Sequence, residues 1–139
     1  MLKKLLLVAA VAAVPVAQAC SYGYDAGKDM TAVIKQNGGG FGVSDRTCKM
    51  LEAAGMSFNI QAAATVLGGV SIGWVSVGII DRNNVISNAY RTVTNVNAKE
   101  PGSMDRAEQL MYTSLVSAVR DLDVAKAIAE VHEARRKAK

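Results

Sequence analysis

The clearest pattern in this chain is an alternation of apolar and polar positions that begins at Met56. Apolar side chains occupy every second position from Met56 to Val66, which is the period of a β-strand with one apolar face. Gly68-Gly69 predicts a turn, after which residues 70–80 resume the alternation. The phase changes at Trp74-Val75, which indicates a β-bulge or a strand buried on both faces.

A third strand is expected over 85–96, after a polar turn at 81–84. Short turns between long strands favour antiparallel pairing. We therefore predict a three-stranded antiparallel β-meander, with Trp74 packed in the core of its central strand. The alternative role for Trp74 is to anchor a ligand or an interface.

Residues 62–80 allow a second interpretation, because these nineteen positions carry no charge and could span a bilayer as a helix. Gly69 and Gly73 also have the spacing found in packed membrane helices. Four glycines, many β-branched residues and an alternation that begins before this segment favour strands. We predict strands and keep the membrane span as an alternative.

Helices are expected on both sides of the meander. Two short helices precede it, one beginning after Asp25 and ending at the glycines 38–40, the other running from Ser44 or Asp45 to Gly55. A long C-terminal helix begins at Ser103 or Asp105, and the aspartates within 121–123 would suit a break into two helices. Its apolar stripe predicts packing across one face of the sheet. The fold class is therefore α+β.

The N-terminal twenty residues have the organisation of a secretory signal. Lys3 and Lys4 precede an apolar run from Leu5 to Val14, and Ala17-Gln18-Ala19 provides the small residues of a cleavage site. We predict a signal peptide over 1–19, a single domain over 20–139, and export to the periplasm or the exterior.

Two cysteines, Cys20 and Cys48, follow the predicted cleavage site. In an oxidising compartment they predict a disulfide that closes a loop of about 29 residues. Cys20 could instead carry a lipoprotein's acyl anchor, although Ala17 and Gln18 fit that signal poorly. A lipidated Cys20 could not pair with Cys48, and membrane association would follow only in that case.

Charge argues against nucleic acid as a partner. Removal of residues 1–19 lowers the 16 basic residues to 14 against 12 acidic ones, and the net charge from +4 to +2. Most of this excess lies in the last nine residues, so the body of the domain is nearly neutral. A nucleic-acid-binding domain needs a basic face on the domain itself.

Residues suited to catalysis are few. His132 is the only histidine and lies in the basic tail, and two cysteines with one histidine make no zinc site. Glycines within 38–42 lack the Lys-Ser/Thr of a phosphate loop. We expect no catalytic, cofactor-binding or metal-binding residues. A hydrolase that uses a pair of carboxylates is the enzymatic alternative, and its candidates are Asp25, Asp29, Asp45, Glu52 and Asp81.

A row of uncharged polar residues on the predicted sheet is a better candidate for function. A sheet face that carries amides and hydroxyls without charge is either solvated or covered by a polar partner. We predict a non-enzymatic protein that binds a protein or envelope partner, or that forms a homodimer through an edge strand. The predicted partner surface comprises Ser57, Asn59, Gln61, Thr65 and, in the loop, Gly39, Gly40 and Phe41; Ser71 extends the row.

Overall fold

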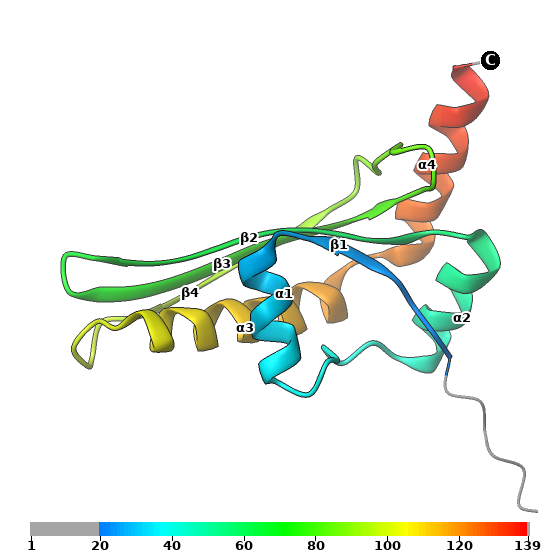
Figure 1. The fold of residues 1–139 in the computed structure, drawn as a ribbon. Coiled ribbons are helices and arrows are strands. Elements are labelled where there is room, and N and C mark those ends of the chain that lie inside the picture. Colours follow the sequence, from blue (N-terminus) through cyan, green and yellow to red (C-terminus); the bar gives the residue numbers. More distant parts are fainter. Residues whose placement is uncertain (1–19, 139) are drawn as a thin grey trace, which may run out of the picture.

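A long antiparallel hairpin forms the centre of the fold (Figure 1). The computed structural model describes residues 20–138, so the predicted signal peptide lies outside the described residues. The elements, in chain order, are β1 (Tyr24–Ala26), α1 (Lys28–Gln36), α2 (Asp45–Ala54), β2 (Ser57–Leu67), β3 (Val70–Ile80), β4 (Arg91–Asn97), α3 (Met104–Asp121) and α4 (Val124–Lys137).

The sheet has four strands in the order β1-β2-β3-β4, whereas the sequence predicts three. The additional strand, β1, pairs in parallel with the start of β2, where Tyr24 is opposite Phe58. Strands β2, β3 and β4 form the expected antiparallel meander. The α+β class is therefore confirmed, and the strand count was wrong because β1 is too short to carry a periodic signal.

Residues 62–80 lie in β2, the turn and β3, so the helical membrane span was wrong for this segment. Pairing runs without interruption through Trp74 and Val75 on both sides of β3, so no β-bulge lies there. The change of phase has another cause. Ser71 and Gly73 are small residues on the side covered by helices, and Ile72 and Trp74 point to the opposite side.

The third meander strand begins later than predicted, at Arg91 rather than at residue 85. Residues 81–90 form a loop, in which Ile86 makes a single bridge to Ile80. The carboxylate of Asp81 accepts hydrogen bonds from the backbone N–H groups of Asn83 and Val85, at 2.8 and 2.9 Å. These bonds hold the start of the loop in a tight turn instead of a strand.

Polar caps explain where three of the helices begin. Ser44 accepts from the Thr47 N–H at the start of α2, Ser103 from Arg106 in α3, and Asp123 from Lys126 in α4. The predicted long C-terminal helix is thus two helices that are separated at Leu122-Asp123. The predicted start at Asp25 was wrong, because Asp25 lies in β1 and α1 begins after Gly27.

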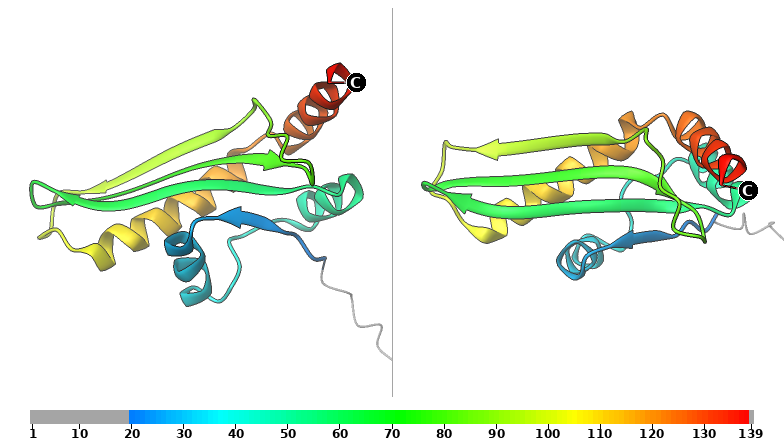
Figure 2. Two further views of the ribbon diagram at one scale, coloured as in Figure 1. Left: turned by 45° about the horizontal axis from the view of Figure 1, so that its top comes forward. Right: turned by 90° about the horizontal axis from the view of Figure 1, so that it is seen from above.

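The hydrophobic core lies between one face of the sheet and the helices. Phe58 and Ile60 of β2 and Val75, Val77 and Ile79 of β3 are at most 3% exposed and point into it. Figures 1 and 2 show α1, α2 and α3 on this side, whereas α4 rises past the opposite side at the end where β3 stops. Helix α3 runs diagonally across β3 and β4.

Candidate binding face of the sheet

One face of the meander is left without a covering helix (Figures 1 and 2). We call this surface the open face. It consists of alternate side chains, namely the odd positions of β2 from Asn59 to Leu67, the even positions of β3 from Val70 to Ser76, and Thr92, Thr94 and Val96 of β4. Strand pairing aligns these positions in rows across the sheet, such as Gln61, Ser76 and Thr92.

The open face carries no charged side chain, since every position in that definition is apolar, hydroxyl or amide. Arg91 is the only charged residue of the three strands, and its partner is Val77, which places it on the helix side. A solvated antiparallel sheet face ordinarily carries charges as well as neutral polar groups. The open face differs from such a face in carrying no charge.

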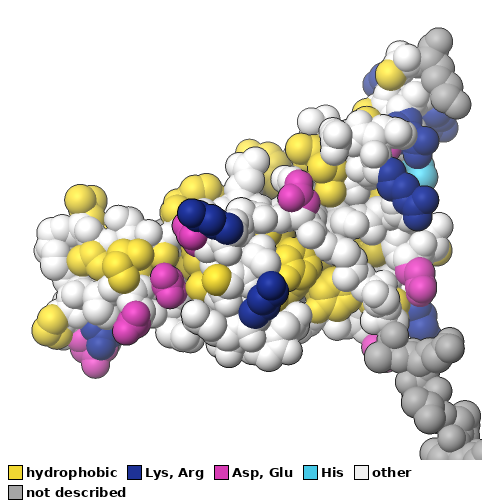
Figure 3. Space-filling model, viewed as in Figure 1, with side chains coloured by type: hydrophobic (Ala, Val, Ile, Leu, Met, Phe, Trp, Pro, Cys, Tyr) yellow, Lys and Arg dark blue, Asp and Glu magenta, His cyan; other side chains and the backbone are white. Residues whose placement is uncertain are grey.

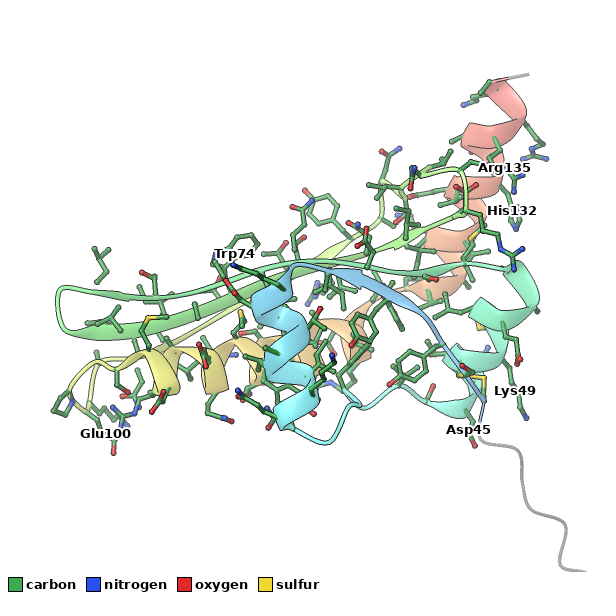
Figure 4. The ribbon with its side chains drawn as sticks, in the orientation of Figure 1. Asp45, Lys49, Trp74, Glu100, His132 and Arg135 are labelled. Atoms are coloured by element: carbon green, nitrogen blue, oxygen red, sulfur yellow. A yellow bond between two sulfur atoms is a disulfide. The ribbon has the colours of Figure 1, made fainter. Side chains whose placement is uncertain are left out.

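Large hydrophobic side chains are exposed at both ends of the open face. Leu67, beside the hairpin turn, is 70% exposed, and Val96 nearby on β4 is 57% exposed. At the opposite end Tyr90 is 67% exposed and Ile86 is 47% exposed. Trp74 lies between the two ends, on the open side of the sheet (Figure 4).

A hollow of about 400 Å³ lies toward the Tyr90 end of the face. Trp74 and Tyr90 contribute aromatic rings to its lining, and the amides of Asn59 and Gln61 contribute polar groups. Among the hydrogen bonds of the described residues, none involves the side-chain amide of Asn59 or Gln61.

The loop 81–90 and helix α4 form a raised border at this end (Figure 1). Glu130 of α4 accepts a hydrogen bond from the Ala89 N–H, and Arg135 lies 3.3 Å from the buried Asp81 carboxylate. The backbone N–H of Val85 is the main cause that lowers the pKa of Asp81, and Arg135 lowers it further. Ser87 accepts from the Ile79 N–H at 3.0 Å, which holds the loop against β3. These contacts fix the position of Tyr90.

The structure brings together only part of the predicted partner surface. Asn59, Gln61 and Thr65 share the open face. Ser57 lies just beyond Asn59, at the opposite end from the hairpin turn and against Gly23. Ser71 belongs to the opposite side, because it is buried and its hydroxyl donates to the Ser103 carbonyl.

The loop residues of the predicted surface lie on the helix side. Phe41 is 0% exposed and packs edge-to-face against Tyr22, Tyr24 and Phe58, so its side chain contributes to the core and not to an exposed surface. The Gly40 carbonyl accepts a hydrogen bond from the Tyr112 hydroxyl at 2.7 Å. Gly39, with a φ of 82°, lies in the same loop.

Trp74 was predicted in the core. It is only partly buried and stands on the open face. Leu67, Tyr90, Thr92 and Val96 were not anticipated. The alternation within 91–97, aligned with that of β3, is the signal that could have placed Thr92 and Val96 on the open face.

Three of the carboxylates considered for a hydrolase, Asp25, Glu52 and Asp81, help to line a groove of about 400 Å³. The Asp81 carboxylate accepts hydrogen bonds within the turn and lies beside Arg135. Its pKa is lowered, whereas a general acid needs a raised pKa. Within residues 20–138, no three His, Cys, Asp or Glu side chains are grouped so as to hold a metal ion.

His132 lies on α4 beside Arg135 and Arg136, where the basic side chains gather (Figures 3 and 4). Cys20 and Cys48 form the predicted disulfide, with their Cα atoms 6.0 Å apart. In this bonded form the sulfur of Cys20 is not available for an acyl anchor.

Comparisons with protein-family models, with curated proteins and with solved structures found no match for this chain. None of the helices within residues 20–138 combines the length and the apolar character needed to cross a membrane.

Proposed function

We propose that this chain is an exported, non-enzymatic protein that acts by binding a partner through the open face. The observation that supports this most strongly is an uncharged sheet surface on which Leu67 and Val96 are each more than half exposed, with the equally exposed Tyr90 at its end. Covering apolar surface contributes about 25 cal/mol per Å². Exposed apolar patches on soluble proteins commonly mark interaction sites.

Export is supported by the signal-like residues 1–19 and by the disulfide. Disulfides form and persist in oxidising compartments such as the periplasm and the exterior. The partner is then a protein or another component of the envelope, and nucleic acid is disfavoured by the neutral surface. Anchoring through a lipidated Cys20 is the alternative, and it requires that the disulfide be absent.

Site-specific photo-crosslinking in the native host tests the proposal. A photoreactive amino acid replaces Thr65, which is exposed on the open face, and in a matched strain it replaces Gln109, which is exposed on α3. We expect adducts from position 65 and few or none from position 109. Equal adducts from both positions, or none from position 65, would overturn the proposal.

The hydrolase alternative is addressed by the same assay. Asp25→Asn and Glu52→Gln remove the other two carboxylates of the groove; Glu52 lies on α2, away from the open face, whereas Asp25 pairs with Asn59 and borders that face. The proposal predicts the same adducts as wild type from position 65 in these variants. Loss of adducts in a variant that keeps its fold would show that the groove, and not the open face alone, takes part in binding.

A further inference from the structure

We propose that the partner of the open face is a second copy of this chain, packed face to face and antiparallel about a two-fold axis near Trp74. This inference rests on the proposed function, because it names the occupant of the same surface. Three features support it: the neutrality of the face, the arrangement of its exposed side chains, and its area.

The first feature is that the open face is suited to contact with itself. In a two-fold dimer the same patch is used by both copies, so a charge on it must find its opposite elsewhere on that same patch or stay unpaired. On this face β2, β3 and β4 carry no charged side chain, and Asp25 of β1 borders the face only beside Asn59. Two copies can therefore meet across the meander without burying an unpaired charge. The amides of Asn59 and Gln61 both donate and accept hydrogen bonds, so each can pair with the polar groups of a copy.

The second feature is the arrangement along β3, and it determines the orientation. Trp74 lies midway between the two ends of the open face. Val70, four residues before it, pairs with the exposed Leu67, and Gly78, four residues after it, lies next to Tyr90. An axis across the strands near Trp74 therefore sets the Leu67 end of each copy against the Tyr90 end of the other.

The raised border excludes the parallel arrangement. Loop 81–90 and α4 stand above the open face at one end only (Figure 1). Two copies packed in parallel would bring both borders together and hold the sheets apart. In the antiparallel arrangement each border lies beyond the hairpin turn of the other copy, and the two sheets can approach to about 10 Å, the usual spacing of packed sheets.

The third feature is the area. The open face is longest along β2, where it runs over nine residues from Asn59 to Leu67. At a rise of about 3.3 Å per residue and a strand spacing of about 4.8 Å, the three-stranded face measures roughly 400 Å². Two such faces bury about 800 Å², the size of a weak, transient interface. The dimer needs the whole face, and we expect a dissociation constant in the micromolar range.

Sedimentation equilibrium of the purified chain from Cys20 to Lys139, with the disulfide intact, tests the proposal. We expect one chain mass at the lowest concentrations and twice that mass at the highest. Trp74→Arg and Ser76→Arg each place a charge near the axis and should raise the dissociation constant about thirtyfold or more. Gln109→Arg, on the exposed side of α3, is the matched control and should leave it unchanged.

The orientation has its own readout. Spin labels attached through Lys99→Cys lie beside the hairpin turn, outside the open face. Across an antiparallel dimer the two labels should be about 30 Å or more apart, given the rise per residue along the strands. Labels close together would overturn the antiparallel arrangement.

The outcomes separate this inference from the proposed function. A wild-type monomer at every concentration, or a dimer that persists in both arginine variants, would overturn the inference. If position 65 then still gives photo-adducts of another mass in the host, the open face binds a different partner and the proposed function stands. A monomer with no adduct from position 65 overturns both. Circular dichroism of each arginine variant checks that it keeps the wild-type fold.

Discussion

Gly73 of β3 lies directly against Met111 of α3, with no room for a side chain between the two backbones. A Cβ added to Gly73 would overlap the Met111 amide nitrogen and lie 2.6 Å from the Ala107 carbonyl oxygen. The Ser114 hydroxyl donates to the Gly73 carbonyl at 3.0 Å, and Asn95 donates to Ser114 at 2.8 Å. This close contact holds α3 against one side of the sheet, while Trp74, the next residue, stands on the other.

Gly73→Ala should therefore destabilise the fold. The new methyl group must displace α3, which we expect to lower the free energy of unfolding by about 3 kcal/mol. Gly40→Ala is the matched control, because a Cβ there would make only an ordinary contact with the Tyr22 hydroxyl at 3.7 Å. Urea unfolding of both variants measures the difference, and equal stabilities would contradict the packing described.

Phe41→Ala separates the core from the binding face. Phe41 is fully buried between three aromatic rings, so truncation should lower the free energy of unfolding by about 3 to 5 kcal/mol. Below its lowered unfolding temperature, the variant should still give photo-adducts from position 65. Unchanged stability in thermal unfolding would show that Phe41 is not the core residue the structure indicates.

Asp81 makes the stability of the raised border depend on pH. Its pKa is lowered in the folded state, chiefly by the Val85 N–H, so its stabilising contribution is present above the unfolded-state pKa. That contribution is lost as the pH falls through the lower, folded-state pKa. Asp81→Asn should thus lower the melting temperature at neutral pH and have a smaller effect in acid below pH about 4. A melting-temperature difference that is the same at both pH values would contradict this account.

The cysteines give a prediction for intact mass. Protein purified from its host should begin at Cys20, weigh two hydrogens less than the reduced chain, and take up two alkyl groups only after reduction. A mass increased by acyl chains, with Cys48 alone reactive, would show the lipoprotein alternative instead. Reduction of the disulfide should lower the free energy of unfolding by about 3.6 kcal/mol, the value for a loop of about 29 residues.

The parts of the fold that the sequence predicts are those with a local cause. The alternation from Met56 to Val66 predicts β2 and its two faces, because side chains alternate in any strand. Ser44, Ser103 and Asp123 cap helices through bonds to residues three positions away, which the sequence shows directly. Strand β1, by contrast, depends on pairing with residues more than thirty positions later.

The candidate site was harder to predict, because which face a helix covers is a tertiary property. The polar positions of β2 indicated Asn59, Gln61 and Thr65, but Trp74 was assigned to the core as a large aromatic residue. Gly73 was the informative position. A glycine within a strand can mark the place where a helix approaches closely, as α3 does here. Side chains alternate along a strand, so this interpretation of Gly73 would have placed Trp74 on the opposite, uncovered face.

Fluorescence of Trp74 tests the central claim most directly, because it is the only tryptophan in the chain and it lies on the open face. Acrylamide quenching of the purified protein is measured over a dilution series, with Ser76→Arg as the monomeric reference. We expect weak quenching at high concentration that rises on dilution to the level of the variant. Quenching that equals that of Ser76→Arg at every concentration would contradict a face covered by a second copy.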